Sequence, residues 1–158
     1  MSDERVILVI DDSEIILERI KLRLEAEGYR VITTTQTVGM ARHLRESHLV
    51  VIDWHMPGIS GGEMLASLRA ACNASPVRPL FYLYTSDSNA AVTAKASGFD
   101  GHFINKGNDD SLARQVEAAF RLTKFRARAS RGARGSGKTE EPSPPARGSG
   151  AKPTKVPR

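Results

Sequence analysis

The sequence has little cysteine and no long apolar run, and both absences narrow the class of protein. The single cysteine, Cys72, excludes an internal disulfide and is typical of a reducing compartment. No apolar stretch approaches the roughly 20 residues needed to cross a bilayer. The first residues lead directly into a predicted strand and do not have the pattern of a signal peptide. We therefore expect a cytoplasmic protein with no membrane span.

Apolar side chains are also nearly absent from the C-terminal region, whose charge differs from that of the rest of the chain. Residues 1–123 hold 13 Lys and Arg against 16 Asp and Glu, whereas residues 124–158 hold 10 against 2. A segment so poor in apolar surface cannot offset an ordering cost of roughly 1–2 kcal/mol per residue. The sequence therefore predicts a folded domain over residues 4–125 and a disordered basic tail over residues 126–158.

Short apolar runs alternate with segments of helical periodicity through the predicted domain. We predict strands over residues 6–10, 30–34, 49–53, 80–84 and 101–104. We predict helices between Ser13 and Gly28 and over residues 37–46, 62–72, 90–96 and 111–125, with Val38, Ala41 and Leu44 facing inward in the second helix. This alternation indicates an α/β fold in which helices cover both faces of a parallel sheet. If the sheet reverses direction after the first strand, the strand order is 2-1-3-4-5 and strands 1 and 3 are neighbours.

Polar side chains stand at the carboxyl ends of four predicted strands, where open α/β sheets bind their ligands. Asp11 and Asp12 follow the first strand, and Asp53 ends the third. Thr85 follows the fourth strand and Lys106 follows the fifth. Taken singly, such residues are common helix caps, turn residues or solvated charges. Taken together, they are the groups needed to bind a divalent cation and a phosphoryl group side by side.

The chemistry of these groups favours magnesium and phosphoryl transfer. Neighbouring carboxylates repel one another unless a cation lies among them. Mg²⁺ takes oxygen ligands and keeps several waters, whereas zinc prefers His and Cys. Lys106 would hold one phosphoryl oxygen as a point charge and Thr85 would offer a hydroxyl to another. Asp53 would attack the electrophilic phosphorus, with catalysis supplied mainly by positioning and charge.

These motifs, in their order and spacing, resemble the receiver domain of bacterial two-component response regulators. The resemblance rests on Asp11-Asp12, on the turn DWHMPGISG that begins at Asp53, on Thr85-Ser86 and on Lys106. It covers residues 4 to about 123. It implies a flavodoxin-like, doubly wound, five-stranded parallel sheet with five helices.

The resemblance also implies specific roles at the phosphorylation site. Asp53 would accept a phosphoryl group from the phosphohistidine of a histidine kinase or phosphotransfer protein. Asp12 and Asp53 would bind Mg²⁺ directly, together with the backbone carbonyl of His55, and Asp11 would act largely through water. Lys106 would contact the phosphoryl group.

A switch pair and a partner-binding face follow from the same resemblance. The hydroxyl of Thr85 would move to the phosphoryl group, and the ring of Phe103 would turn inward. The face formed by the fourth helix, fifth strand and fifth helix would then change shape and bind a downstream protein.

The turn after the fifth strand departs from the family pattern. The family usually has Lys-Pro with a cis peptide, and this chain has Lys106-Gly107. Glycine is permissive enough to rebuild the turn. His55 and Asp87 occupy positions that the family varies to tune the lifetime of the phosphoryl group.

These features suggest three functions, of which the third fits the residues least well. No second folded domain is predicted, so we expect a stand-alone receiver that switches a protein partner or relays its phosphoryl group, catalysing only its own phosphorylation and dephosphorylation. Alternatively, the basic tail is the effector and binds nucleic acid or an anionic partner, although it lacks the interleaved aromatics that stack on bases and its composition is more typical of a solubilising segment or linker. The third reading, an aspartate-nucleophile phosphatase, would need a second acid where this chain has His55.

Overall fold

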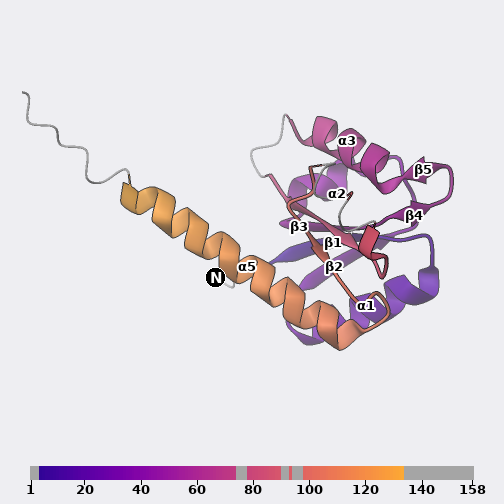
Figure 1. The fold of residues 1–158 in the computed structure, drawn as a ribbon, viewed down its shortest axis with the longest axis horizontal. Helices are drawn as coiled ribbons and strands as arrows, with labels where there is room; N and C mark the ends of the chain where they lie inside the picture. Colours follow the sequence, from indigo (N-terminus) through magenta and orange to yellow (C-terminus); the bar gives the residue numbers. More distant parts are fainter. Residues whose placement is uncertain (1–3, 74–77, 90–92, 94–97, 134–158) are drawn as a thin grey trace, which may run out of the picture. The chain divides into compact units, whose positions relative to one another are not determined.

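The structure is a computed structural model that describes residues 4–73, 78–89, 93 and 98–133, with side chains through residue 124. The helices are α1 (Glu14–Ala26), α2 (Ala41–Glu46), α3 (Gly61–Cys72) and α5 (Asp109–Ala133) (Figure 1). The strands are β1 (Val6–Ile10), β2 (Arg30–Thr34), β3 (Leu49–Asp53), β4 (His55–Met56), β5 (Ile59–Ser60), β6 (Leu80–Tyr84) and β7 (Gly101–Phe103). The distribution of contacts within the chain defines two compact units, Met1–Leu122 and Thr123–Arg158. Of the second unit, the structure describes residues 123–133, which are helical.

The main sheet has five parallel strands in the order β2-β1-β3-β6-β7, which confirms the predicted order 2-1-3-4-5. The chain moves outward from β1 to the edge strand β2 and then crosses back to β3. This reversal makes β1 and β3 neighbours, with Ile10 opposite Ile52. On the other side of β3, Asp53 is opposite Tyr84, and Tyr84 is in turn opposite Phe103. The carboxyl ends of four strands therefore meet at one edge of the sheet.

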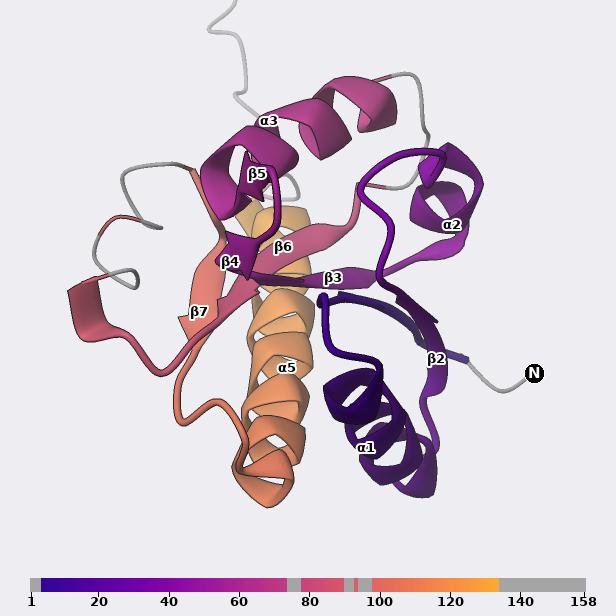
Figure 2. The same ribbon diagram turned by 90° about the vertical axis from the view of Figure 1, so that its right-hand side faces the viewer.

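Helices cover both faces of the sheet, with α2 and α3 on one face and α1 and the first part of α5 on the other (Figure 2). Alternate residues of each central strand point to opposite faces, so β1 divides its side chains between two cores. Leu8 and Ile10 pack with α2 and α3, and Ile7 and Val9 pack with α1 and α5. Strands buried on both faces explain the continuous apolar runs in the sequence.

The second helix is shorter than predicted. It begins at Ala41 and not at residue 37, and Val38, expected to face inward, is 76% exposed. Ala41 is also exposed, whereas Leu44 is buried as predicted. Gly39 has a φ of +80°, a left-handed conformation that a helix cannot include. Met40, 4% exposed, supplies the apolar contact that the prediction assigned to Val38.

A short antiparallel hairpin of β4 and β5 follows β3, where only a turn was predicted. Ser60 then begins α3 with a capping box, because its side chain accepts from the backbone N–H of Glu63 while Glu63 accepts from the N–H of Ser60. The helix follows the prediction to within one residue, and Met64, Leu65 and Leu68 are buried. The sequence predicted α3 correctly because its N-terminal cap and its apolar stripe indicated the same helix.

The predicted helix over residues 90–96 and the end of the last helix cannot both be compared with the structure in full. The predicted helix over residues 90–96 lies outside the described residues apart from Thr93, which is helical like Ser88 and Asn89. The last helix continues past the predicted end at Phe125 to Ala133, so residues 126–133, assigned to a disordered tail, are helical. The remainder of the predicted tail, 134–158, lies outside the described residues. Among residues 4–73, 78–89 and 98–133, no helix is both long and apolar enough to cross a membrane.

Candidate functional site

Three carboxylates and one ammonium group converge at the carboxyl edge of the sheet. Oxygen atoms of Asp11, Asp12 and Asp53 all lie within 4.8 Å of one another. The Nζ atom of Lys106 is 2.7 Å from Oδ2 of Asp11 and 2.9 Å from Oδ1 of Asp53. The sequence predicted this convergence from strand order alone, and the geometry of these four residues agrees with it.

Two of the three carboxylates are buried, and backbone contacts hold one of them, Asp11. Asp11 is 2% exposed, and its backbone N–H donates to the carbonyl of Thr34 in β2. Its Oδ1 accepts from the N–H of Ser13, which also caps α1, so both carboxylate oxygens of Asp11 have protein partners. Asp53 is 5% exposed at the end of β3, whereas Asp12 is exposed to solvent. Asp12 is thus the carboxylate most open to an incoming ion.

Burial and ion pairing oppose each other within this cluster. Burial raises the pKa of Asp11 above its usual range, although Lys106 and the Ser13 N–H oppose that rise. Burial alone would lower the pKa of Lys106, but hydrogen bonds and charge attraction from Asp11 and Asp53 outweigh it and raise the pKa above its ordinary value. Lys106 is therefore charged at neutral pH and shared between two carboxylates from different strands.

The predicted switch residues lie beside the cluster at the ends of β6 and β7. Thr85 is 4% exposed and directly follows Tyr84, the residue paired with Asp53. Its hydroxyl accepts from the N–H of Asp87, and its own N–H donates to the carbonyl of Phe103. Phe103 is 2% exposed and stacks on Tyr82 with ring centroids 4.5 Å apart. The aromatic ring is thus already directed inward in this structure.

The two positions expected to tune the phosphoryl lifetime have clear structural surroundings. His55 is two residues past Asp53, in β4, and its side chain is exposed. The Oδ1 atom of Asp87 accepts from the N–H of Asn89 at 2.8 Å. Asp87 therefore caps the helical residues that follow it.

The turn that presents Lys106 has an unusual backbone. Asn105 has a φ of +62° and Gly107 a φ of +97°, and no cis peptide bond occurs in the described residues. The Lys106–Gly107 peptide is therefore trans, unlike the cis Lys-Pro of the family pattern. Two left-handed residues flank Lys106, a conformation that Asn and Gly adopt at low cost.

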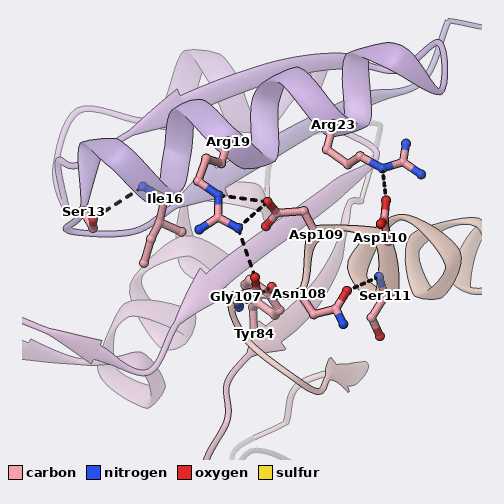
Figure 3. Close-up of polar contacts among 10 residues, drawn as sticks. All are labelled: Ser13, Ile16, Arg19, Arg23, Tyr84, Gly107, Asn108, Asp109, Asp110 and Ser111. Carbon is pink, nitrogen blue, oxygen red and sulfur yellow. Dashed lines mark hydrogen bonds and ion pairs between the residues drawn. The ribbon is translucent and has the colours of Figure 1, made fainter.

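Sequence reasoning missed the residues that hold this turn in place. The N–H of Gly107 donates to the hydroxyl of Tyr84, and the Ser86 hydroxyl donates to the Lys106 carbonyl. The guanidinium of Arg19, on α1, donates to the Gly107 carbonyl and pairs with Asp109 (Figure 3). The apolar pattern marked Tyr84 only as a strand residue, and nothing in the sequence distinguishes Arg19 from other exposed helix residues.

The cluster has the composition of a site for a hard cation. Its three candidate ligands offer only carboxylate oxygens, the ligand type that Mg²⁺ and Ca²⁺ prefer. Within the described part of the chain, no other group of three His, Cys, Asp or Glu residues has suitable geometry. The three aspartates could therefore hold a metal ion next to the Asp53 carboxylate.

Comparison with known sequences gives a consistent result. The response regulator receiver domain family matches residues 7–117. The transcriptional regulatory protein KdpE of Mycobacterium tuberculosis is 34% identical over 122 residues, which are 75% of this chain and 52% of that protein. The phosphate regulon transcriptional regulatory protein PhoB of Rhizobium meliloti is 27% identical over 120 residues, covering 75% of this chain and 53% of PhoB. The chain spans about half the length of the curated relatives it matches.

Solved structures share the fold. The chemotaxis protein CheY4 of Vibrio cholerae has a TM-score of 0.61 at 19% identity, covering 73% of this chain and 98% of CheY4. A CheY-like response regulator receiver domain protein of Methanospirillum hungatei has a TM-score of 0.64 at 20% identity, covering 78% of this chain and 99% of that protein. Fold, acidic cluster and family match agree, and the chain belongs to the response regulator receiver domain family of two-component systems.

Proposed function

We propose that this chain accepts a phosphoryl group on Asp53 from a histidine kinase or phosphotransfer protein, and that this changes its affinity for a partner or passes the group on. The observation that supports the proposal most is the position of Lys106, whose Nζ contacts both Asp11 and Asp53. A lysine shared by two buried carboxylates is costly to assemble for stability alone, because the desolvation of three charges opposes folding.

The proposed reaction needs little covalent chemistry from the protein. A carboxylate oxygen of Asp53 forms a bond to phosphorus while the bond from phosphorus to the donor imidazole nitrogen breaks, and that nitrogen keeps the electron pair. Lys106 then shifts its contact toward the phosphoryl oxygens and stabilises their charge. The Thr85 hydroxyl donates to another of these oxygens. Positioning and electrostatics supply the rate acceleration.

We infer that the ion at the acidic cluster is Mg²⁺, with Asp12, Asp53 and the backbone carbonyl of His55 as ligands and Asp11 acting through water. Both oxygens of Asp11 already accept from protein donors, which supports an indirect role for it. Asp12 is exposed and available to an ion. Bound Mg²⁺ would neutralise charge that develops on the phosphoryl oxygens.

The proposed output is a change at the edge of the sheet formed by β7. The backbone N–H of Thr85 donates to the carbonyl of Phe103, so any displacement of the Thr85 backbone that accompanies the movement of its hydroxyl would alter β7. The exposed residues His102 and Ile104, the latter 49% exposed, lie on either side of Phe103. Together with α5 they form the described part of the expected partner-binding face.

Mass spectrometry after incubation with acetyl phosphate and Mg²⁺ tests the proposal directly. Wild type should gain the mass of one phosphoryl group, and Asp53→Ala should gain none. Omitting Mg²⁺ or adding a chelator should strongly reduce the gain in wild type. Asp110→Ala is a matched control, since Asp110 is an acid outside the metal cluster whose partner is Arg23. Equal incorporation by wild type and Asp53→Ala would refute Asp53 as the acceptor.

A second candidate function concerns the basic C-terminal region, which has 10 Lys and Arg against 2 acidic residues over 124–158. Such a charge excess favours binding to nucleic acid or another polyanion. Because α5 is helical through Ala133, the test deletes residues 134–158 and keeps the helix. Salt-dependent binding of the full chain to DNA that is lost on deletion would support this function. Absence of such binding in the full chain would exclude it.

A further inference from the structure

Both polar atoms of the Lys106–Gly107 peptide have side-chain partners from the end of β6. The N–H of Gly107 donates to the Tyr84 hydroxyl at 2.9 Å, and the Ser86 hydroxyl donates to the Lys106 carbonyl at 3.2 Å. Tyr84 is 1% exposed, so its hydroxyl lies in a fixed place. Proline, usual at this position in the family, has no N–H and could not make the first bond.

The next peptide is held from the opposite side. Arg19 donates from Nη2 to the Gly107 carbonyl at 3.1 Å. The same guanidinium donates to Oδ2 of Asp109 at 2.8 and 3.1 Å, which fixes its orientation at the start of α5 (Figure 3). Two successive peptides after Lys106 are therefore bound by residues from β6 and α1.

The sheet register places Tyr84 between the strand of Asp53 and the strand that leads to Lys106. Tyr84 is paired with Asp53 on one side and with Phe103 on the other. It stands between the strand that ends in the acceptor carboxylate and the strand that leads to Lys106. A glycine-containing turn has wide conformational freedom, and a hydrogen bond from this turn to Tyr84 removes much of that freedom. The bond thus restrains the backbone that carries Lys106 against the strand paired with Asp53.

We propose that Tyr84 is a positioning residue for Lys106, assisted by Arg19, and that the two replace the restraint that proline gives in most of the family. The inference rests on the proposed phosphorylation of Asp53. It assigns no contact with the phosphoryl group to either residue. Both act through the backbone that places the Lys106 ammonium.

A double-mutant cycle with Lys106 separates this role from a general effect on folding. Tyr84→Phe keeps the ring and removes the hydroxyl. We expect it to slow phosphoryl uptake from acetyl phosphate about three- to tenfold, the effect of losing one hydrogen bond. In a Lys106→Ala background, Tyr84→Phe should cause no further slowing. Tyr29→Phe, at the amino end of β2 and against Phe120, is the matched control and should match wild type.

Arg19 offers a second test with its own control on the same helix. Arg19→Gln should slow uptake about two- to threefold, as expected for an exposed contact. Arg23→Gln removes a guanidinium that binds Asp110 and Glu27 and has no contact with Gly107 among the described bonds, and it should leave the rate unchanged. Thermal unfolding of each variant verifies that the rates come from folded protein.

The position of Lys106 can also be measured without phosphorylation. In trace labelling with acetic anhydride, Lys106 of wild type should react slowly because two carboxylates cover it, and Tyr84→Phe should increase its labelling several-fold relative to exposed Lys21. Unchanged labelling overturns the positioning role. The positioning role is also overturned if Tyr84→Phe takes up the phosphoryl group at the wild-type rate. The same holds if Tyr84→Phe slows uptake equally in the wild-type and Lys106→Ala backgrounds. If wild type accepts no phosphoryl group, the proposed function fails and the labelling alone decides this inference.

Discussion

At the scale of single residues, the site depends on one ammonium group that serves two carboxylates. Lys106 contacts Asp11, which directly follows β1, and Asp53 at the end of β3, and its side chain is 19% exposed. Removing it would leave two buried acids without their shared counter-ion, which costs more than the ion pair itself contributes. The lysine therefore contributes to stability as well as to the proposed reaction.

The stability contribution of Lys106 has a defined pH dependence. Burial opposes the charged form, but hydrogen bonds to Asp11 and Asp53 raise the pKa of Lys106 above 10.5. A raised pKa in the folded state means that this stability is fully present below 10.5 and is lost as pH rises through the folded value. We expect Lys106→Met to cost about 1.5–3 kcal/mol near neutral pH and progressively less at strongly alkaline pH. Urea unfolding of both proteins measures the difference, and a constant difference through the alkaline range would contradict the assignment.

The conformation of Gly107 gives a second prediction at this scale. Its φ is +97°, and a Cβ atom added there would meet no atom within 4 Å. The cost of Gly107→Ala is therefore that of a left-handed backbone alone, about 1–2 kcal/mol. Gly107→Asn should cost less, because asparagine tolerates this region, as Asn105 does at +62°. Urea unfolding measures the loss of stability of each variant. Equal losses for Gly107→Ala and Gly107→Asn would show that the left-handed backbone does not determine the cost of substitution.

At the scale of elements, the segment from β3 to α3 fixes where Asp53 stands. A Cβ atom on Gly61, the first residue of α3, would lie 2.9 Å from the Trp54 ring and 3.2 Å from its Cα. We expect Gly61→Ala to displace the backbone after Asp53, to cost about 1–3 kcal/mol, and to change the fluorescence of Trp54, the single tryptophan. Ser60→Ala is the control, since it removes a helix cap worth about 1 kcal/mol and leaves Trp54 in place. A Gly61→Ala spectrum identical to wild type would contradict this packing argument.

Sequence patterns predicted elements well where two signals coincided and poorly where one acted alone. The strands and α3 had apolar runs together with caps or turn residues. The start of α2 was wrong because the apolar spacing of Val38 was weighed without the left-handed Gly39 that follows it. The hairpin of β4 and β5 has two residues in each strand, too few to show any alternation. The end of α5 was placed too early because low hydrophobicity was taken as disorder.

The candidate site followed from the strand order, but its supporting contacts did not. Asp11, Asp12, Asp53 and Lys106 were predictable because parallel strands end at one edge. Tyr84 was not, since a tyrosine in a buried strand has the same pattern whether or not its hydroxyl is used. Its bond uses the N–H of Gly107, in a turn where this chain departs from the family pattern, so neither the apolar pattern nor the resemblance pointed to it.

At the scale of the whole folded unit, the site couples strands that are distant in sequence. Its groups come from positions 11, 12, 53 and 106, and they meet only when β1, β3, β6 and β7 have formed one sheet. An unfolded chain has no such arrangement, so any ligand of the cluster binds the folded state selectively. Ligand binding should therefore raise the free energy of unfolding of the whole folded unit.

Mg²⁺ should raise the free energy of unfolding of wild type by about 2.7 kcal/mol at a free concentration 100 times its dissociation constant. Asp53→Asn removes one proposed ligand, so the gain at the same Mg²⁺ concentration should fall. Asp100→Asn is a matched control, because Asp100 is an acid outside the cluster that bonds to Phe81 and Arg69. Each protein is compared with itself in urea unfolding with and without Mg²⁺, so that the basal effect of the substitution cancels. Equal Mg²⁺ gains in wild type and Asp53→Asn would show that the ion binds elsewhere, and the three-aspartate cluster would lose its assignment as the metal site.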